Sequence, residues 1–180
     1  MILMIYNPKE MEQKAVENAM AAMCAAARTA PKTKGQDFIY TLALTGEEKN
    51  KVAQTMREMG SRLFGENSWF HRDAGNVEAA EGLVLIGMEN VRRGLPHCGL
   101  CGFADCDACA QVNGTCAFGN LDLGIALGSA VSVAADLRMD CRIMFSVGKA
   151  AMEMGLVKEG IFWQGIPVSV SGKSIFFDRK

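Results

Sequence analysis

A cysteine-rich stretch between Pro96 and Gly119 constrains this chain more than any other feature. It holds five of the seven cysteines, separated by two, four, two and six residues: Cys98, Cys101, Cys106, Cys109 and Cys116. Four converging thiolates can hold a zinc ion or an iron–sulfur cluster, and a first pair two residues apart can reach one centre from a single tight turn. The stretch therefore predicts a metal centre, and we expect the rest of the chain to be its scaffold.

Chain length, net charge and apolar runs limit the number of domains, the partners and the compartment that we expect. A chain of 180 residues, 49% hydrophobic, is long enough for one core, so we expect a single domain over 1–180 with a metal-binding insertion at 92–120. The net charge of -1 provides no basic surface for nucleic acid. The longest apolar run, Ala19 to Ala27, is too short to span a bilayer, and the start lacks a signal peptide. We therefore expect a cytoplasmic protein with no membrane or nucleic-acid partner, in which reduced thiols favour metal over disulfides.

Hydrophobic patterning predicts helices and strands around one sheet. Helical periodicity runs from about Pro8 to Arg28, and Gly82–Met88 is a continuous apolar run typical of a buried central strand. The elements alternate only roughly, which favours an α+β sandwich with helices on both faces of the sheet. The other expected elements are strands over 38–44, 142–147 and 161–170, helices over 122–139 and 148–154, a helix from a capping box at Thr45 and Glu48 to Phe64, and a short helix capped by Asn76.

Two further features point to packing against a partner. Gly124 and Gly128 are four residues apart, so they share one helix face and permit a close approach. That approach is either tight helix or dimer packing or the binding of a flat ligand. Phe176 and Phe177 make the tail too apolar for a free end, so we expect it to dock on this subunit or on a partner.

The spacing of the cysteines bears on the kind of centre. Zinc sites usually pair two knuckles across a longer spacer, whereas only four residues separate Cys101 from Cys106. The C-x2-C-x2-C-x3-C-P run of two-cluster ferredoxins is also absent. CGLCGFADCDACA resembles instead the motif CGxCGxxxCxxxA of a small four-iron, four-sulfur domain found in electron-transfer complex subunits and corrinoid-enzyme partners.

This resemblance implies one [4Fe-4S] cluster and a set of ligands. Cys98, Cys101 and Cys106 match the first three ligands of the motif, and Cys116 matches its more distant fourth. Cys109 falls where the motif carries an aromatic residue, so we expect it to be a spare thiol.

Charged residues flank the expected cluster on both sides. A cluster held by four thiolates is anionic, so Arg92, Arg93 and His97 are expected to compensate its charge. Asp105 and Asp107 would oppose it and lower its reduction potential.

Most of the chain resembles a family of uncharacterised proteins that contain a ferredoxin domain. The resemblance is carried, in the family's order, by AARTAPKTKG, RDAGNVE, LPHCGLCGFADC, LDLGIALGSAV and the terminal GIPVSVSGKSIFFDR. It implies an iron–sulfur centre but no established activity.

A more distant similarity is to flavin-dependent nitroreductases. It rests on AARTAPKTKGQD after the first helix, the central small-residue helix and the closing GIP segment. It implies a nitroreductase-like sandwich with a central mixed sheet flanked by helices, an intertwined homodimer, and FMN as a second cofactor. By this analogy Arg28, Lys32 and Lys34 would approach the flavin phosphate, with Gly165 and Lys173 as further cofactor-binding candidates. The alternative for the three basic residues is a solvated helix end favoured by the helix dipole.

Two functions compete at this point. The first is an iron–sulfur redox protein that passes single electrons to a redox partner protein or a small-molecule acceptor, with a flavin-dependent oxidoreductase as its enzymatic form. The second is a binding module whose loop is stapled by structural zinc or by a cluster. The sequence offers no acid, base and nucleophile constellation, which weakens a hydrolase interpretation and leaves the catalytic residues unassigned.

Overall fold

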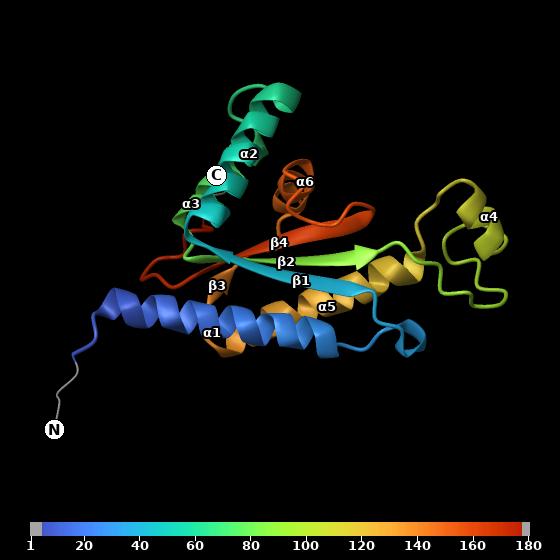
Figure 1. Ribbon diagram of the computed structural model, residues 1–180, viewed down its shortest axis with the longest axis horizontal. Coiled ribbons are helices and arrows are strands. Elements are labelled where there is room, and N and C mark those ends of the chain that lie inside the picture. Colours follow the sequence, from blue (N-terminus) through green and yellow to red (C-terminus); the bar gives the residue numbers. More distant parts are fainter. Residues whose placement is uncertain (1–4, 178–180) are drawn as a thin grey trace.

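The computed structural model describes residues 5–177, which form one four-stranded sheet with helices on both faces (Figure 1). The strands have the order β1-β2-β4-β3. In chain order the elements are α1 (Pro8–Thr29), η1 (Thr33–Gly35), β1 (Ile39–Thr45), α2 (Gly46–Phe64), α3 (Trp69–Ala79), β2 (Gly82–Glu89), α4 (Cys106–Gln111), α5 (Ala117–Asp136), β3 (Asp140–Cys141), α6 (Phe145–Glu153) and β4 (Ile161–Ser169).

The α+β sandwich is confirmed, but the sheet is antiparallel rather than mixed. Each of its three strand pairs is antiparallel. β1 ends at Thr45, which pairs with Gly82 at the start of β2. Since α2 and α3 together lead away from this end of the sheet and back to it, the next strand must run in the opposite direction.

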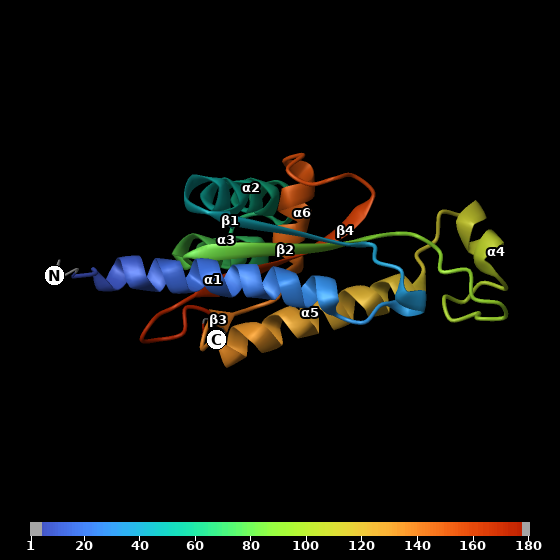
Figure 2. The ribbon, with the colours of Figure 1, turned by 60° about the horizontal axis from the view of Figure 1, so that its bottom comes forward.

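Two apolar layers enclose the sheet. α2, α3 and α6 cover one face and α1 and α5 cover the other (Figures 1 and 2). β2 lies between β1 and β4, and its residues from Gly82 to Met88 are all buried, as expected for the central strand. Residues that alternate along β2 contribute to opposite layers: Leu83 and Leu85 to the first, Val84 and Ile86 to the second.

Three local expectations are wrong. The strand expected over 142–147 is replaced by the start of α6, and only Met144 forms an isolated bridge, with Gly165. Here a close approach decides the structure, because Gly165 leaves room for Val147 of α6 on the sheet. Asn76 lies inside α3, which starts after Ser68. Thr45 does precede α2, but its side chain makes no capping hydrogen bond.

α5 is apolar on nearly every side. Among residues 5–177 it is the one helix whose length and composition would allow it to cross a membrane. Its buried stripe of Ala126, Ala130 and Ala134 belongs to the layer that contains α1. The two predicted glycines, Gly124 and Gly128, lie on its exposed side, with open space where a side chain would be.

The two phenylalanines of the tail have different environments. Phe176 is buried against the layer formed by α2, α3 and α6, so docking on the same subunit is confirmed for this residue. Phe177 is 87% exposed. The tail beyond it, 178–180, lies outside the described residues.

The cysteine-rich segment projects beyond one end of the sheet. It leaves the end of β2 at Glu89, carries the short helix α4, and returns to the start of α5 (Figures 1 and 2). The chain therefore holds this segment at two points, one on the central strand and one on a core helix.

Candidate metal centre

All five cysteines of the segment line one cleft. Apolar groups, chiefly Leu95, Leu100, Phe103 and Phe118, line the cleft with them, and Arg92 and Arg93 border it. Its empty space is ≈ 400 Å³, including the side open to solvent. The five cysteines that share the cleft are Cys98, Cys101, Cys106, Cys109 and Cys116.

Left-handed backbone turns and a helix cap place the first four thiols. Gly99 and Gly102 have positive φ of 57° and 83°, a region where glycine avoids the strain of a side chain. The Gly102 amide donates to the Gly99 carbonyl at 2.9 Å, which closes a tight turn around Cys101. Asp105 then caps α4 by accepting from the Ala108 amide at 2.8 Å. Because α4 starts directly after this cap, Cys106 and Cys109 lie one helical turn apart.

Cys116 comes to the cleft from a different element, the N-terminus of α5. Its amide donates to the Asn90 side-chain carbonyl at 3.1 Å, and the Asn90 amide group donates to the Gly114 carbonyl at 3.1 Å. Asn90 therefore ties the chain just after β2 to the chain just before α5. Cys116 is the N-cap residue of α5 and so lies at the positive end of the helix dipole.

Cys109 is the least exposed thiol of the five, although the motif leaves it without a role. Burial raises the pKa of the Cys109 thiol, a hydrogen bond with Arg92 lowers it, and the neighbouring Cys101 thiol raises it again. A side chain at Gly114 would come within 2.9 Å of its sulfur, so glycine allows the loop to close over it. Cys24 and Cys141, by contrast, pack in the layer formed by α1 and α5, away from the cleft.

The thiols surround the cleft without meeting at one point. Among residues 5–177, no three side chains of His, Cys, Asp or Glu are placed to hold a single metal ion. A compact ion such as Zn²⁺ needs its ligands at about 2.0–2.3 Å from one centre. Among the described residues, the thiols as placed therefore form no such set around a single ion.

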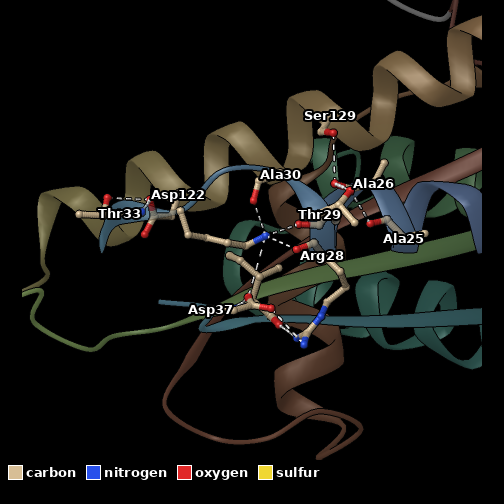
Figure 3. Close-up of polar contacts among 12 residues, drawn as sticks. Ala25, Ala26, Arg28, Thr29, Ala30, Thr33, Asp37, Asp122 and Ser129 are labelled. Atoms are coloured by element: carbon tan, nitrogen blue, oxygen red, sulfur yellow. Dashed lines mark hydrogen bonds and ion pairs between the residues drawn. The ribbon is translucent and has the colours of Figure 1, made fainter. Parts of the chain in front are cut away.

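A buried ion pair anchors the root of the cysteine segment. Arg93 donates to one carboxylate oxygen of Asp122, from Nε at 3.1 Å and from Nη2 at 2.9 Å. The amide and hydroxyl of Thr33 donate to the other oxygen at 2.9 and 2.8 Å (Figure 3). The Arg93 guanidinium also lies 4.6 Å from the centre of the Phe38 ring. Three segments that are distant in sequence are thereby joined at α5.

Sequence reasoning missed Asp122. Its signal is a lone acid inside an otherwise apolar helix, since a charge in that setting needs a partner. The partner could not be identified from the sequence, because Arg93 and Thr33 lie 29 and 89 residues away from Asp122.

The residues predicted to bind FMN do not form one site. Lys32 donates to main-chain carbonyls at the end of α1, at 2.8 Å to Ala27 and 2.7 Å to Ala30, and burial lowers the pKa of its amine. Arg28 forms an ion pair with Asp37 at 3.0 Å (Figure 3). Lys32 therefore bonds the end of α1, as a basic residue near a helix C-terminus can, but its side chain is only 5% exposed rather than solvated.

The other three predicted residues are also engaged elsewhere or distant. Lys34 donates to the Arg93 carbonyl at 3.2 Å. Gly165 is buried in β4, where Val147 occupies the space that its missing side chain leaves. Lys173 follows the end of β4 that pairs with the start of β2, and this is the opposite end of the sheet from Arg28.

Comparison with known proteins places the chain in a family. A family model described as "Uncharacterized protein containing a ferredoxin domain (DUF2148)" matches residues 112–179, which include Cys116 and α5. A protein of Archaeoglobus fulgidus, named "Uncharacterized protein", is 40% identical over 98% of both chains. The chain belongs to this ferredoxin-domain family. The resemblance expected from its motifs is thus confirmed.

The fold is similar to that of several solved nitroreductases and flavoproteins. One is a nitroreductase with bound FMN from Bacteroides fragilis (TM-score 0.58, 12% identity, 91% of this chain and 81% of that one). Another is a nitroreductase with bound FMN from Desulfitobacterium hafniense (TM-score 0.59, 13% identity, 87% and 79%). A BluB-like flavoprotein from Clostridium difficile is also similar (TM-score 0.57, 14% identity, 91% and 84%). The nitroreductase-like fold of this ferredoxin-domain protein is therefore confirmed.

Replacing Asp122 by asparagine should strongly destabilise the protein, because it leaves the buried Arg93 without a counter-charge. We expect a loss of about 3 kcal/mol in the free energy of unfolding, measured by urea denaturation. Glu78→Gln is the matched control, since it breaks the solvent-exposed pair with Arg57 and should cost far less. Equal losses in the two variants would contradict the anchoring role of Asp122.

Proposed function

We propose that this protein is an iron–sulfur redox protein that carries one [4Fe-4S] cluster in the cysteine cleft and transfers single electrons. Its ligands are Cys98, Cys101, Cys106 and Cys116. The observation that carries the proposal is the gathering of these thiols, from a turn and two different helices, around one apolar cleft. Membership of a ferredoxin-domain family and a fold shared with FMN oxidoreductases support redox chemistry in general.

Cluster binding accounts for the cleft better than zinc does. A cluster has its own core of iron and sulfide, so its thiolate ligands surround that core, and the five thiols line one cleft here. Zinc would require them to converge on one ion. The competing function, a binding module stapled by zinc, is therefore the second candidate.

The protein's own residues would supply the setting for the cluster. Gly99 and Gly102 permit the turn that presents Cys101, and Asn90 holds Cys116 at the helix N-terminus. The apolar lining limits water, which strengthens the electrostatic effect of every charge nearby. When bound, the cluster would accept or donate one electron, and these residues would set its potential through hydrogen bonds and exposure.

Flavin is not needed for this proposal. FMN is bound in several proteins of the same fold. The five residues predicted to bind it here are spread over both ends of the sheet or occupied by main-chain carbonyls, a carboxylate and a side chain, so within one chain they provide no phosphate cradle. The electron route therefore rests on the cysteine cleft, with a partner protein or a small molecule as the acceptor. Free thiols at such a centre fit a reducing compartment, so we place the protein in the cytoplasm.

We also propose a homodimer formed through the exposed side of α5. Leu121 and Ile125 are 51% and 45% exposed there, next to the open glycines Gly124 and Gly128. An apolar face with two small residues permits close approach of a second copy. The same surface explains why the glycines do not face the core.

Protein purified without oxygen should be brown and contain about four iron and four sulfide per chain. Its visible absorbance should bleach with dithionite, because the cluster accepts an electron. Metal analysis, sulfide analysis and absorbance spectra measure these properties. A colourless protein with one zinc per chain would refute the redox proposal and favour the stapled binding module.

Replacing Cys116 by serine should remove the cluster, whereas the same change at Cys109 should leave the iron content at the wild-type level. The reason is that Cys116 is a proposed ligand and Cys109 is not. Iron per chain in anaerobic preparations measures the effect, and far-ultraviolet circular dichroism checks that both variants fold. The opposite pattern would exchange the roles of the two thiols.

Gly128→Arg should convert the dimer to a monomer, because it places a charge in the open, apolar side of α5. Light scattering coupled to size-exclusion chromatography measures the mass. Gln54→Arg, which adds the same charge to the exposed side of α2, is the control and should stay dimeric. A wild-type monomer would contradict the proposed interface.

A further inference from the structure

Three basic residues precede or enter the cysteine segment, and they occupy different environments. Arg93 is buried and its charge is paired with Asp122. His97 is exposed and adopts a left-handed turn with φ of 54°. Arg92 lines the cleft, and among residues 5–177 no carboxylate forms an ion pair with it. Of these three basic side chains in the described part of the chain, Arg92 is the one that lines the cleft without an ion pair, and the Asp105 carboxylate that also lines the cleft does not pair with it.

One nitrogen of the Arg92 guanidinium donates a hydrogen bond, whereas another is buried without an acceptor among the described residues. Its Nη2 donates to the Gly114 carbonyl at 3.0 Å, and the guanidinium lines the same cleft as the Cys109 thiol. Its Nε is buried and has no hydrogen-bond partner within the described part of the chain. A buried N–H donor without an acceptor is unfavourable, so the site is incomplete for a guanidinium. An anionic group in the cleft would supply both the missing acceptor and the missing counter-charge.

We infer that Arg92 sets the reduction potential of the cluster by donating a hydrogen bond to one of its sulfur atoms and by compensating its negative charge. This inference rests on the proposed function and assigns one residue to its control. Cys109 then acquires a role as well. The Gly114 carbonyl orients the guanidinium, and the buried Cys109 thiol would fill the same cleft beside it rather than bind iron.

The direction of the effect follows from the charge balance. Reduction adds one electron to the cluster and forms or breaks no bond, so the bound centre becomes more negative by one charge. A guanidinium keeps its proton over the accessible pH range, so its attraction for the centre increases on reduction. In an apolar cleft that attraction is weakly screened. Arg92 therefore favours the reduced form and raises the potential.

Arg92→Gln tests this inference by redox titration. At a fixed potential near the wild-type midpoint, the ratio of reduced to oxidised cluster should fall at least tenfold, which is a negative shift of about 59 mV for a one-electron couple. Arg92→Lys, which keeps the charge, should shift less. Arg138→Gln is the matched control, because it removes the same charge from an exposed position just beyond the far end of α5 and should leave the midpoint unchanged.

A second measurement distinguishes control of the reduction potential by Arg92 from a purely structural role of this residue. Thermal unfolding of the apo proteins should differ little between wild type and Arg92→Gln, since the guanidinium has no counter-charge there. With the cluster bound, the variant should unfold at a lower temperature than the wild type. Equal destabilisation of both forms, or an unchanged midpoint in a variant that keeps its cluster, would overturn the inference. A wild-type protein without a cluster would instead refute the proposed function, and this is seen before any variant is made.

Discussion

The arrangement of this protein depends on the buried contact between Arg93 and Asp122. Arg93 follows the central strand, Asp122 lies in the first turns of α5, and Thr33 brings the loop after α1 to the same carboxylate. A buried ion pair adds little net stability compared with apolar groups of the same size, because both charges lose their hydration. Its effect is to specify position, since either charge alone would be strongly unfavourable. The cysteine segment is thereby held between a strand and a helix that cannot shift independently.

Because the Arg93–Asp122 pair fixes where the cysteine-rich segment leaves β2 and enters α5, the segment has a defined geometry. Glycine turns and the Asp105 cap orient the first four thiols locally, whereas Cys116 is placed by α5 and by Asn90. The cleft thus combines thiols from the projecting segment with one thiol at the start of a core helix. Under the proposed function, this origin would keep the surroundings of a cluster nearly unchanged when an electron arrives.

The residues predicted to bind flavin have structural contacts in this chain. Arg28, in the last turn of α1, pairs with Asp37, Lys32 after α1 bonds main-chain carbonyls, and Gly165 makes room for the packing of α6. In this chain the sheet and its helices therefore support the cysteine-rich segment, which is attached to β2 and α5. Fold similarity at about 12% identity shows the architecture, and the chemistry must be argued from the side chains.

Local patterns in the sequence determined the long helix Pro8–Thr29, the buried strand Gly82–Glu89 and a cysteine-rich segment between that strand and the next long helix. These features follow from the periodicity of apolar residues and the spacing of cysteines, both of which are local properties of the sequence. Only the tertiary structure decided that 142–147 contains the start of a helix rather than a strand, that Asp122 pairs with Arg93, and that Arg92 lines the cysteine cleft without an ion pair among the described residues. Each of these outcomes is set by contacts between residues far apart in the chain, where burial makes an unpaired charge or an overfilled space too unfavourable to persist.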